Sequence, residues 1–366
     1  MAHQKQKNVG VIGLGIIGSR VTDSLRRKGF RVFVWNRSPR PVPNFVGGPA
    51  ELAEMCDYVE IFVSDDDALL QVVRQMAPAL AARHIVLAHS TVAPHSMRAA
   101  ADIVERRGAR FIEAPFTGSK IGAELGELVF YVAGDDTALQ EVRPILEASG
   151  KEIIKIGQIG QATIIKLATN ILTAASVQAA AEALALVQNV GISPEKLTAA
   201  LQGNASNSRT LSMKLPKMIE GDFEPHFSVK HMLKDMQIAN QIALSRYLDL
   251  GVATAARDQL VEQVQWGHGD NDYSAVARKF LYDIAPAVYE ESRMEAQDEQ
   301  SDAGEPVTGT TESEKPSLEP QGASAMSAQQ PLLSFSGAGD GVAQTASRLR
   351  RGFLRQLLSR FSSGQG

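Results

Sequence analysis

The chain has 366 residues, of which 44% are hydrophobic, 21% are charged and 6% are aromatic. This length accommodates two to three domains, and the composition is typical of a soluble globular protein, which excludes fibrous, collagen-like and wholly disordered classes. The formal net charge of −4 is unevenly distributed, because residues 1–289 carry 30 basic and 30 acidic side chains whereas residues 290–366 carry 7 and 11. A neutral body gives no electrostatic reason to bind nucleic acid.

Residues 1–158 alternate between short apolar, β-branched runs and segments of helical periodicity. This alternation predicts an α/β domain in which right-handed crossovers build a Rossmann-type doubly wound parallel sheet. We expect strands at 8–13, 31–35, 58–63, 84–88, 111–114, 129–133 and 152–156, and helices at 19–28, 68–80 and 96–107.

Residues 159–289 have helical periodicity, which predicts an all-α domain that begins with a long interdomain helix over 159–189. The longest apolar stretch, 164–190, includes Lys166, Asn170 and Glu182, so we interpret it as a buried helix of a soluble protein and not as a membrane span. Breaks in the helical pattern are expected at 191–194, 203–207, 220–225 and 267–272.

The last 77 residues differ in composition from the rest. Residues 290–346 are rich in Glu, Ser, Gly and Pro and predict a disordered acidic linker. Residues 347–366 place leucines and phenylalanines on one helical face and five arginines mostly on the remainder, which predicts a basic amphipathic helix. Such a helix could contact a membrane surface or a partner protein, or it could fray in solution, since Gly352 interrupts it.

Cys56 is the single cysteine, so an intramolecular disulfide is excluded. The N-terminus passes from a short polar lead directly into a strand, without a secretory signal. We therefore expect a cytoplasmic protein.

A glycine-rich motif directly follows the first predicted strand and precedes the first predicted helix, the context that makes it specific for a dinucleotide. The first glycine permits a tight turn, the second lets a pyrophosphate approach the backbone, and the third permits close helix packing. The cofactor-binding residues expected here are Gly13, Leu14, Gly15, Ile16, Ile17 and Gly18.

The end of the second strand predicts which nicotinamide cofactor fits. An NAD-binding domain usually places a carboxylate here for the ribose 2′-hydroxyl, but this chain reads Asn36-Arg37-Ser38. Arg37 offers a planar charged group for a 2′-phosphate, and Asn36 and Ser38 offer neutral hydrogen bonds. We therefore expect NADP, with Val63 and Ser64 after the third strand as further cofactor-binding residues.

Lys166 and Asn170 lie four residues apart on the long helix, so both project from one face. Their apolar surroundings disfavour the charged ammonium and lower the pKa of a lysine toward the range useful for donating a proton. Two loops, one with Ser90 and Thr91 and one with Thr117, Gly118 and Ser119, follow parallel strands and could complete a pocket for a carboxylate.

Several spaced motifs resemble the β-hydroxyacid dehydrogenase family, which includes 3-hydroxyisobutyrate dehydrogenases and glyoxylate/succinic semialdehyde reductases. The resemblance runs from about residue 8 to 289. It implies that Lys166 is the catalytic general acid and that Asn170 orients the substrate. The motifs are Gly13-x-Gly15-x-x-Gly18, Ser90-Thr91-x-x-Pro94, Glu113-Ala-Pro115-Phe-Thr117-Gly118-Ser119, Gly160-x5-Lys166-x3-Asn170 and Phe227-x6-Lys234-Asp235.

The same resemblance implies that Thr117, Gly118 and Ser119 hold the substrate carboxylate, and that Thr91 and Lys234 line the nicotinamide side; we add Ser90 to the expected substrate-binding residues. Gly118-Ser119-Lys120 is more similar to the glyoxylate/succinic semialdehyde group, whereas Phe116 and Thr117 depart from the usual Val and Ser. It also implies a homo-dimer or tetramer.

The sequence thus predicts an NADPH-dependent oxidoreductase that reduces a small carboxylate-bearing aldehyde or 2-oxo acid. One alternative is a non-catalytic NADP-sensing scaffold tethered by its basic C-terminal helix. Another is imine reductase-like activity, although imine reductases usually carry Asp or Tyr in place of Lys166. No metal is expected, because the seven histidines lack ligand spacing and residues 65–67, three aspartates, begin a predicted helix, where carboxylates act as caps.

Overall fold

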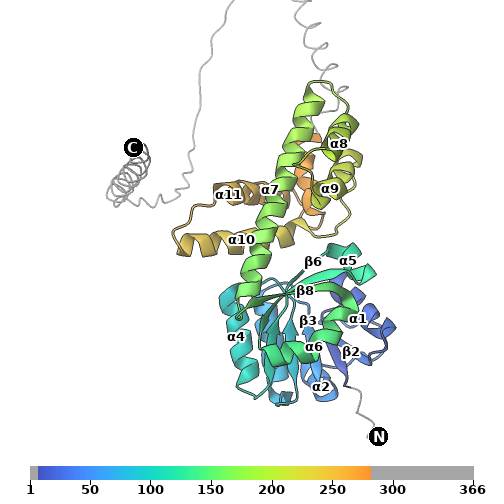
Figure 1. Cartoon of the computed structure of the whole chain (residues 1–366), viewed down its shortest axis with the longest axis vertical. Helices are drawn as coiled ribbons and strands as arrows, with labels where there is room; N and C mark the ends of the chain where they lie inside the picture. The colour runs from blue at the N-terminus through green and yellow to red at the C-terminus, as the bar shows by residue number, and fades with distance from the viewer. Residues whose placement is uncertain (1–6, 282–366) are drawn as a thin grey trace, which may run out of the picture. The chain divides into compact units, whose positions relative to one another are not determined.

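The computed structural model describes residues 7–281 and comprises a sheet-containing part followed by a helical part (Figure 1). The transition occurs between the last strand and the long helix that begins at Gln161. The predicted linker at 290–346 and the predicted amphipathic helix at 347–366 lie outside the described residues, and they stay predictions.

The sheet has the strand order β2-β1-β3-β4-β5-β7-β6, with β8 paired to β7. The first five strands are parallel, as the alternation of strands and helices predicted. β7 is antiparallel to β5 and β6, because the chain after β5 turns back through β6 and a short helix instead of making a full crossover. The strands are β1 (Val9–Ile12), β2 (Val32–Trp35), β3 (Tyr58–Ile61), β4 (Ile85–Ala88), β5 (Arg110–Glu113), β6 (Phe116–Thr117), β7 (Leu128–Gly134) and β8 (Gly150–Gly157).

Helices cover both faces of the sheet, and alternate strand residues divide into two apolar clusters. Tyr58 and Leu87 belong to one cluster, whereas Val59 and Val86 belong to the other, as the two-residue period of a strand requires. On one side α1 contacts α5 and α6, and on the other α3 contacts α2 and α4. These helices are α1 (Ile16–Arg27), α2 (Pro49–Met55), α3 (Asp66–Met76), α4 (Pro94–Glu105), α5 (Ser119–Leu125) and α6 (Asp136–Ser149), with a 3-10 helix at Ala77–Ala79.

The helical part is organised around α7, which contacts α9, α10 and α11. By length and composition alone, α7 is long and apolar enough to cross a membrane. Its most apolar 18-residue segment has a mean hydropathy of 1.4, and 39% of that segment is buried. Contacts with three other helices are what a core helix of a helical domain makes. The elements are α7 (Gln161–Asn189), α8 (Pro194–Gln202), α9 (Arg209–Glu220), α10 (Val229–Ser245), α11 (Gly251–Gln265), a 3-10 helix at Tyr273–Ala277 and α12 (Arg278–Leu281).

The breaks expected at 191–194, 203–207, 220–225 and 267–272 all separate helices. One further break, at 246–250 between α10 and α11, was not expected, because this segment contains neither proline nor glycine. Tyr247 takes the left-handed conformation there, with φ of 57° and 99% exposure, so the turn needs no glycine to form.

A buried ion pair fixes the loop between α9 and α10. Lys214 is 1% exposed and Asp272 is fully buried, and Nζ of Lys214 lies 2.7 and 2.8 Å from the two carboxylate oxygens. Asp272 also accepts hydrogen bonds from the backbone amides of His226 and Phe227. Because a buried charge is tolerated only when it is paired and hydrogen-bonded, this arrangement determines the path of the chain just before α10.

Candidate active site

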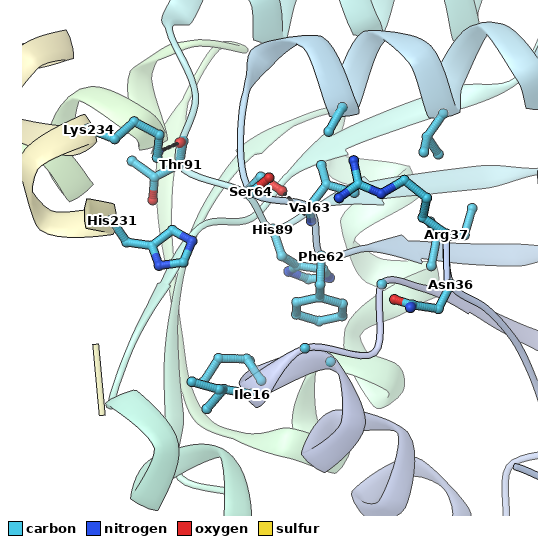
Figure 2. A pocket seen from close by; sticks show the side chains of 18 of the residues that line it. Ile16, Asn36, Arg37, Phe62, Val63, Ser64, His89, Thr91, His231 and Lys234 are labelled. Atoms are coloured by element: carbon cyan, nitrogen blue, oxygen red, sulfur yellow. Dashed lines mark hydrogen bonds between the residues drawn. The ribbon is translucent and has the colours of Figure 1, made fainter. Parts of the chain in front are cut away.

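A cavity of about 530 Å³ lies at the carboxyl ends of β1, β2, β3 and β4 and extends to α10 (Figure 2). The strand order reverses between β1 and β3, so the cavity lies at the topological switch point where open α/β sheets bind ligands. The predicted site residues that line it are Gly13, Gly15, Ile16, Ile17, Gly18, Asn36, Arg37, Ser38, Val63, Ser64, Ser90, Thr91 and Lys234.

The absence of a side chain at each glycine of the β1–α1 turn has a different structural explanation. Gly13 has φ of 95°, and a Cβ there would lie 1.9 Å from the carbonyl oxygen of Phe62. A Cβ on Gly18 would lie 1.9 Å from the carbonyl oxygen of Gly13. A Cβ on Gly15, the N-cap of α1, would meet no atom within 4 Å. The space beside Gly15 is open to the cavity, so the turn fits a pyrophosphate at the helix N-terminus.

The end of β2 is held against the glycine turn by Asn36. Its Oδ1 accepts a hydrogen bond from the backbone amide of Leu14 at 2.9 Å, and its Nδ2 donates to the carbonyl oxygen of Ser38 at 2.8 Å. Leu14 is buried, and it acts through this amide and not as part of the cavity lining. Asn36 is thus occupied by the backbone, which leaves Arg37, exposed at the cavity edge, as the charged group available to a ligand.

The ends of β3 and β4 are linked by Ser90, whose Oγ accepts a hydrogen bond from the amide of Val63 at 2.9 Å. Asp65 caps α3 by accepting from the amide of Ala68, and Asp66 accepts from the amide of Ala93 at 2.9 Å. The interpretation of the three aspartates as caps of the helix that they begin therefore accounts for Asp65, whereas Asp66 binds the N-terminus of the next helix, α4. Among residues 7–281 no group of three His, Cys, Asp or Glu side chains could hold a metal ion.

Lys234 of α10 points toward Thr91 in the sheet-containing part (Figure 2). Lys234 and the adjacent Asp235 lie close enough to Lys166 for their charges to affect its pKa. Nζ of Lys234 donates to the carbonyl oxygen of Thr91 and lies 2.7 Å from Oδ1 of Asp235. Asp235 is 1% exposed and accepts a hydrogen bond from Nδ2 of Asn170 at 2.6 Å. The structure therefore connects Asn170, Asp235, Lys234 and the loop after β4 in one network.

Lys166 is half-buried on α7, and no described side chain or backbone group forms a hydrogen bond or ion pair with its Nζ. Burial has the largest effect on its pKa and lowers it, the carboxylate of Asp235 raises it, and the positive charge of Lys234 lowers it, which together give a pKa of about 8. Lys166 and Asn170 do not line the 530 Å³ cavity itself, which is bounded on this side by Lys234 and Asp235. An amine with a pKa near neutrality can exchange protons with a bound ligand.

The first turn of α7 is anchored by Glu113, the last residue of β5. Its buried carboxylate accepts hydrogen bonds from the backbone amides of Gly160 and Thr163, the latter at 2.6 Å. Burial raises the pKa of Glu113, and these hydrogen bonds oppose the effect. The carboxylate satisfies amide donors that have no partner within the helix, and it fixes the segment that carries Lys166 against the sheet.

The predicted carboxylate-binding residues lie between β5 and α5, outside the cavity lining, although the adjacent Phe116 lines it. Thr117 is paired with Val129 in the sheet, and Gly118 and Ser119 have φ of 126° and 57°. Lys120 lies 2.7 Å from Glu224, an ion pair that joins α5 to the loop before α10. A carboxylate bound here would meet the positive-φ turn at Gly118 and Ser119, and the adjacent Lys120 is already paired with Glu224.

Sequence reasoning missed several cavity residues. Asp235 lines the cavity, and Glu113 anchors the helix that carries Lys166. Both belong to the motifs of the resemblance but have no predicted role, and a carboxylate at the end of an apolar strand is the sequence signal that could identify Glu113. Phe227 also belongs to one of these motifs without a predicted role. His231 was not predicted to line the cavity, because the histidines lack the spacing of metal ligands. The remaining unpredicted lining residues carry no sequence signal of their own; they include Phe62, Gln71, Gln75, His89, Phe116 and His226.

Family models match almost all of the described chain. Residues 8–158 match the NAD binding domain of 6-phosphogluconate dehydrogenase, and residues 160–280 match the NAD-binding domain of NADP-dependent 3-hydroxyisobutyrate dehydrogenase. Glyoxylate/succinic semialdehyde reductase 1 of Arabidopsis thaliana is 31% identical over 278 residues, which cover 73% of this chain and 96% of that protein. The chain belongs to the β-hydroxyacid dehydrogenase family. Membership confirms the resemblance and the predicted class of NAD(P)-dependent oxidoreductase.

One further sequence and one solved structure are similar to this β-hydroxyacid dehydrogenase. The human cytokine-like nuclear factor N-PAC is 29% identical over 288 residues, which cover 75% of this chain but 52% of that protein. A solved 3-hydroxyisobutyrate dehydrogenase from Salmonella typhimurium has a TM-score of 0.68 at 23% identity, covering 75% of this chain and 100% of its own. This second likeness supports the predicted fold, a Rossmann-type domain followed by a helical one.

Proposed function

We propose that this β-hydroxyacid dehydrogenase is an NADPH-dependent reductase of a small aldehyde or 2-oxo acid that bears a carboxylate, with Lys166 as general acid. The observation that carries the proposal is the state of Lys166: a half-buried amine without a hydrogen-bond partner in the described chain, with a pKa of about 8. A structural lysine would be paired, as Lys214 is with Asp272.

When bound, the reduced nicotinamide supplies the hydride for this chemistry. Lys166 donates a proton to the carbonyl oxygen of the substrate as negative charge develops on it, which is the role of a general acid. Asp235, by holding both Asn170 and Lys234, keeps the two polar side chains beside Lys166 in fixed positions. Water exclusion by the two parts of the protein would strengthen every one of these interactions.

The cofactor proposal is NADP in preference to NAD. Arg37 is exposed at the cavity edge, and no carboxylate lies at the end of β2 to repel a 2′-phosphate. Asn36 is bound to the backbone of the glycine turn, so it positions that turn. Arg37 is therefore the charged residue proposed to bind the 2′-phosphate, with the Ser38 hydroxyl beside it.

The proposed substrate carboxylate site comprises Thr117, Gly118 and Ser119, and Ser90, which lines the cavity, is the further proposed substrate-binding residue. Gly118 and Ser119 both have positive φ, so consecutive amides turn away from regular structure and can face one anion. The sequence similarity to a glyoxylate/succinic semialdehyde reductase favours a short substrate with one terminal carboxylate.

Replacing Lys166 with methionine tests the function. Lys166→Met removes the proton donor but keeps the length of the side chain, so kcat for NADPH-dependent reduction of glyoxylate or succinic semialdehyde should fall about 10²- to 10⁴-fold. The dissociation constant for NADPH should stay within about 2-fold, since phosphate contacts dominate cofactor binding. Lys196→Met, on α8 outside the cavity, is the matched control. Undiminished turnover by Lys166→Met would reject the proposal.

A second candidate is a cofactor-sensing scaffold, favoured by the similarity to human N-PAC, which is named as a nuclear factor. In this case NADPH would bind but no substrate in a panel of small oxo acids and semialdehydes would be turned over. Flotation of the full chain and of residues 1–346 with anionic liposomes tests tethering through 347–366. Equal flotation of the two would reject membrane tethering.

Self-association is a further part of the proposal. Apolar side chains on α7 and α11 are exposed, with Leu172 at 69%, Leu186 at 68% and Val252 at 68%. A dimer or tetramer of a cytoplasmic enzyme that formed through these helices would cover them. Light scattering after size-exclusion chromatography measures the oligomeric state directly, and a monomer at micromolar concentration would reject it.

A further inference from the structure

A buried acid–base pair lies next to the cofactor cavity and takes no part in the proposed reaction. Glu60, in the middle of β3, is fully buried, and His89, directly after β4, is 1% exposed. Nε2 of His89 lies 3.3 Å from Oε1 of Glu60. Figure 2 shows His89 beside the Phe62 ring on the wall of the cavity.

Glu60 occupies an apolar environment. Its register partners on the neighbouring strands are Val11 and Leu87, both members of the apolar cluster on that face of the sheet. Neither carboxylate oxygen of Glu60 has a hydrogen-bond partner within residues 7–281, and His89 forms the one ion-pair contact recorded for it in this range. An unpaired carboxylate in such a place would be very costly.

The hydrogen bond of His89 to the backbone shows that one of its two ring nitrogens carries a proton. Nδ1 lies 2.8 Å from the carbonyl oxygen of Ala114, which can only accept, so Nδ1 carries a proton. With Nε2 unprotonated and Glu60 charged, a lone pair would face a carboxylate inside an apolar core. Nε2 of His89 also has no hydrogen-bond partner within residues 7–281, so the 3.3 Å contact is electrostatic, and one proton carried by the pair removes this repulsion.

The aromatic rings around His89 agree with this arrangement. Phe62 stacks on the imidazole with a centroid separation of 4.4 Å and an interplanar angle of 11°, and the Phe130 ring lies 5.4 Å away. These contacts hold the plane of the imidazole in a fixed orientation.

We propose that Glu60 and His89 carry one proton as an electrostatic pair and act as a positioning pair for the active site. His89 directly precedes Ser90 and Thr91, and its ring holds Ala114, which directly precedes the segment containing Thr117. One side chain therefore ties together the loops after β4 and β5, which carry the nicotinamide-side and substrate-side residues. The kinetic consequences rest on the proposed function, whereas the shared proton does not.

Thermal unfolding of three variants tests the shared proton independently of activity. Glu60→Leu and His89→Leu should each lower Tm, because each leaves a buried polar partner without its counterpart. The double variant Glu60→Leu/His89→Leu should have a higher Tm than His89→Leu, since no lone carboxylate stays buried. If the double variant unfolds below both single variants, with additive losses in Tm, the pair does not share a proton.

Ring nitrogen NMR of the full chain labelled with ¹⁵N-histidine provides a second test. His84 is a buried reference on the same strand: its Nδ1 accepts from the amide of Ala81 at 2.8 Å, and its Nε2 lies 2.9 Å from the carbonyl oxygen of Ala53. In Glu60→Gln, which preserves side-chain shape, the Nε2 signal of His89 should shift while both His84 signals stay constant. An unshifted His89 signal would overturn the proposal.

Kinetics separate positioning from stability. His89→Leu should lower kcat/KM about 10- to 100-fold, because displacement of reacting groups by about 1 Å costs a factor of this order. The double variant should be equally slow despite its higher Tm. His84→Leu, at the other end of β4, should lose Tm but keep kcat/KM within about 3-fold of the wild type. Wild-type kcat/KM in folded His89→Leu overturns the positioning role, whereas an active Lys166→Met variant would reject the proposed function alone.

Discussion

Asn170 donates a hydrogen bond of 2.6 Å to the buried carboxylate of Asp235, and this links α7 to α10. The other oxygen of Asp235 lies 2.7 Å from Nζ of Lys234. The same negative charge raises the pKa of Lys166, against the larger effect of burial. One carboxylate thus orients an amide, pairs with one lysine and tunes the protonation of another.

The first prediction is the pH dependence of the wild-type enzyme. A general acid must carry its proton, so in the direction of carbonyl reduction kcat/KM should fall as pH rises through the pKa of Lys166, about 8. In the direction of alcohol oxidation the unprotonated amine is required, and kcat/KM should rise over the same interval. Steady-state rates in both directions between pH 6 and 10 measure this. If kcat/KM changed with pH in the same sense for reduction and oxidation, the prediction would be contradicted.

The second prediction concerns Asp235→Asn. Removing this negative charge disfavours the ammonium form of Lys166, so its pKa should fall below about 8 and the basic limb of the reduction profile should move to lower pH by about one unit. The pH profile of kcat/KM is the measurement. Asp258→Asn, at an exposed site on α11, should leave the limb in place. A shift of the Asp235→Asn limb to higher pH is incompatible with the proposed electrostatics.

The third prediction concerns Arg37→Ala. A charged hydrogen bond contributes about 1.5–3 kcal/mol, so loss of Arg37 should weaken NADPH binding about 10- to 100-fold and leave NADH binding nearly unchanged. Fluorescence titration of both cofactors against Arg37→Ala and the nearby exposed Arg40→Ala measures the difference. Equal losses for NADPH and NADH would show that Arg37 does not contact the 2′-phosphate.

The fourth prediction compares two glycines of the same turn. Gly15→Ala adds a methyl group into space where no protein atom lies within 4 Å, so Tm should change little while the Kd for NADPH rises at least about 10-fold. Gly13→Ala should instead lower Tm, because φ is 95° and the methyl group would lie 1.9 Å from a carbonyl oxygen. Calorimetric unfolding and cofactor titration of both variants measure the two effects. Unaltered NADPH affinity in Gly15→Ala would place the pyrophosphate elsewhere.

Most of the fold and the cofactor half of the site could be predicted from local patterns. The glycine turn, the β2 end and the loops after β3 and β4 are each encoded within a few residues, and all of them line one cavity. Strand ends differed by one or two residues, and α1 begins at Ile16 instead of 19, since Gly15 already serves as its N-cap. α2, β6 and α5 are short and carry little periodic signal.

The roles of Glu60, His89, Glu113 and Asp235 could not be assigned from sequence, because each depends on a partner far away in the chain. Glu113 binds amides about 50 residues later, and Asp235 binds Asn170 across 65 residues. Glu60 within a β-branched run looks like an ordinary half-exposed strand residue until the sheet register places it in a core. Antiparallel β7 was missed for the same reason, since strand direction is set by long-range pairing.

The capping of α7 by Glu113 limits how separable the two parts of the chain are. The Rossmann-type portion supplies the carboxylate, and the following helix supplies the amides that satisfy it. A truncation after residue 158 would remove these amides and leave the Glu113 carboxylate without them, and grafting a foreign helical domain at this junction would detach Lys166 from the sheet. Chimaeras of this protein should therefore be joined beyond Asn170, inside the helix, so that Lys166 is inherited together with the Rossmann-type half.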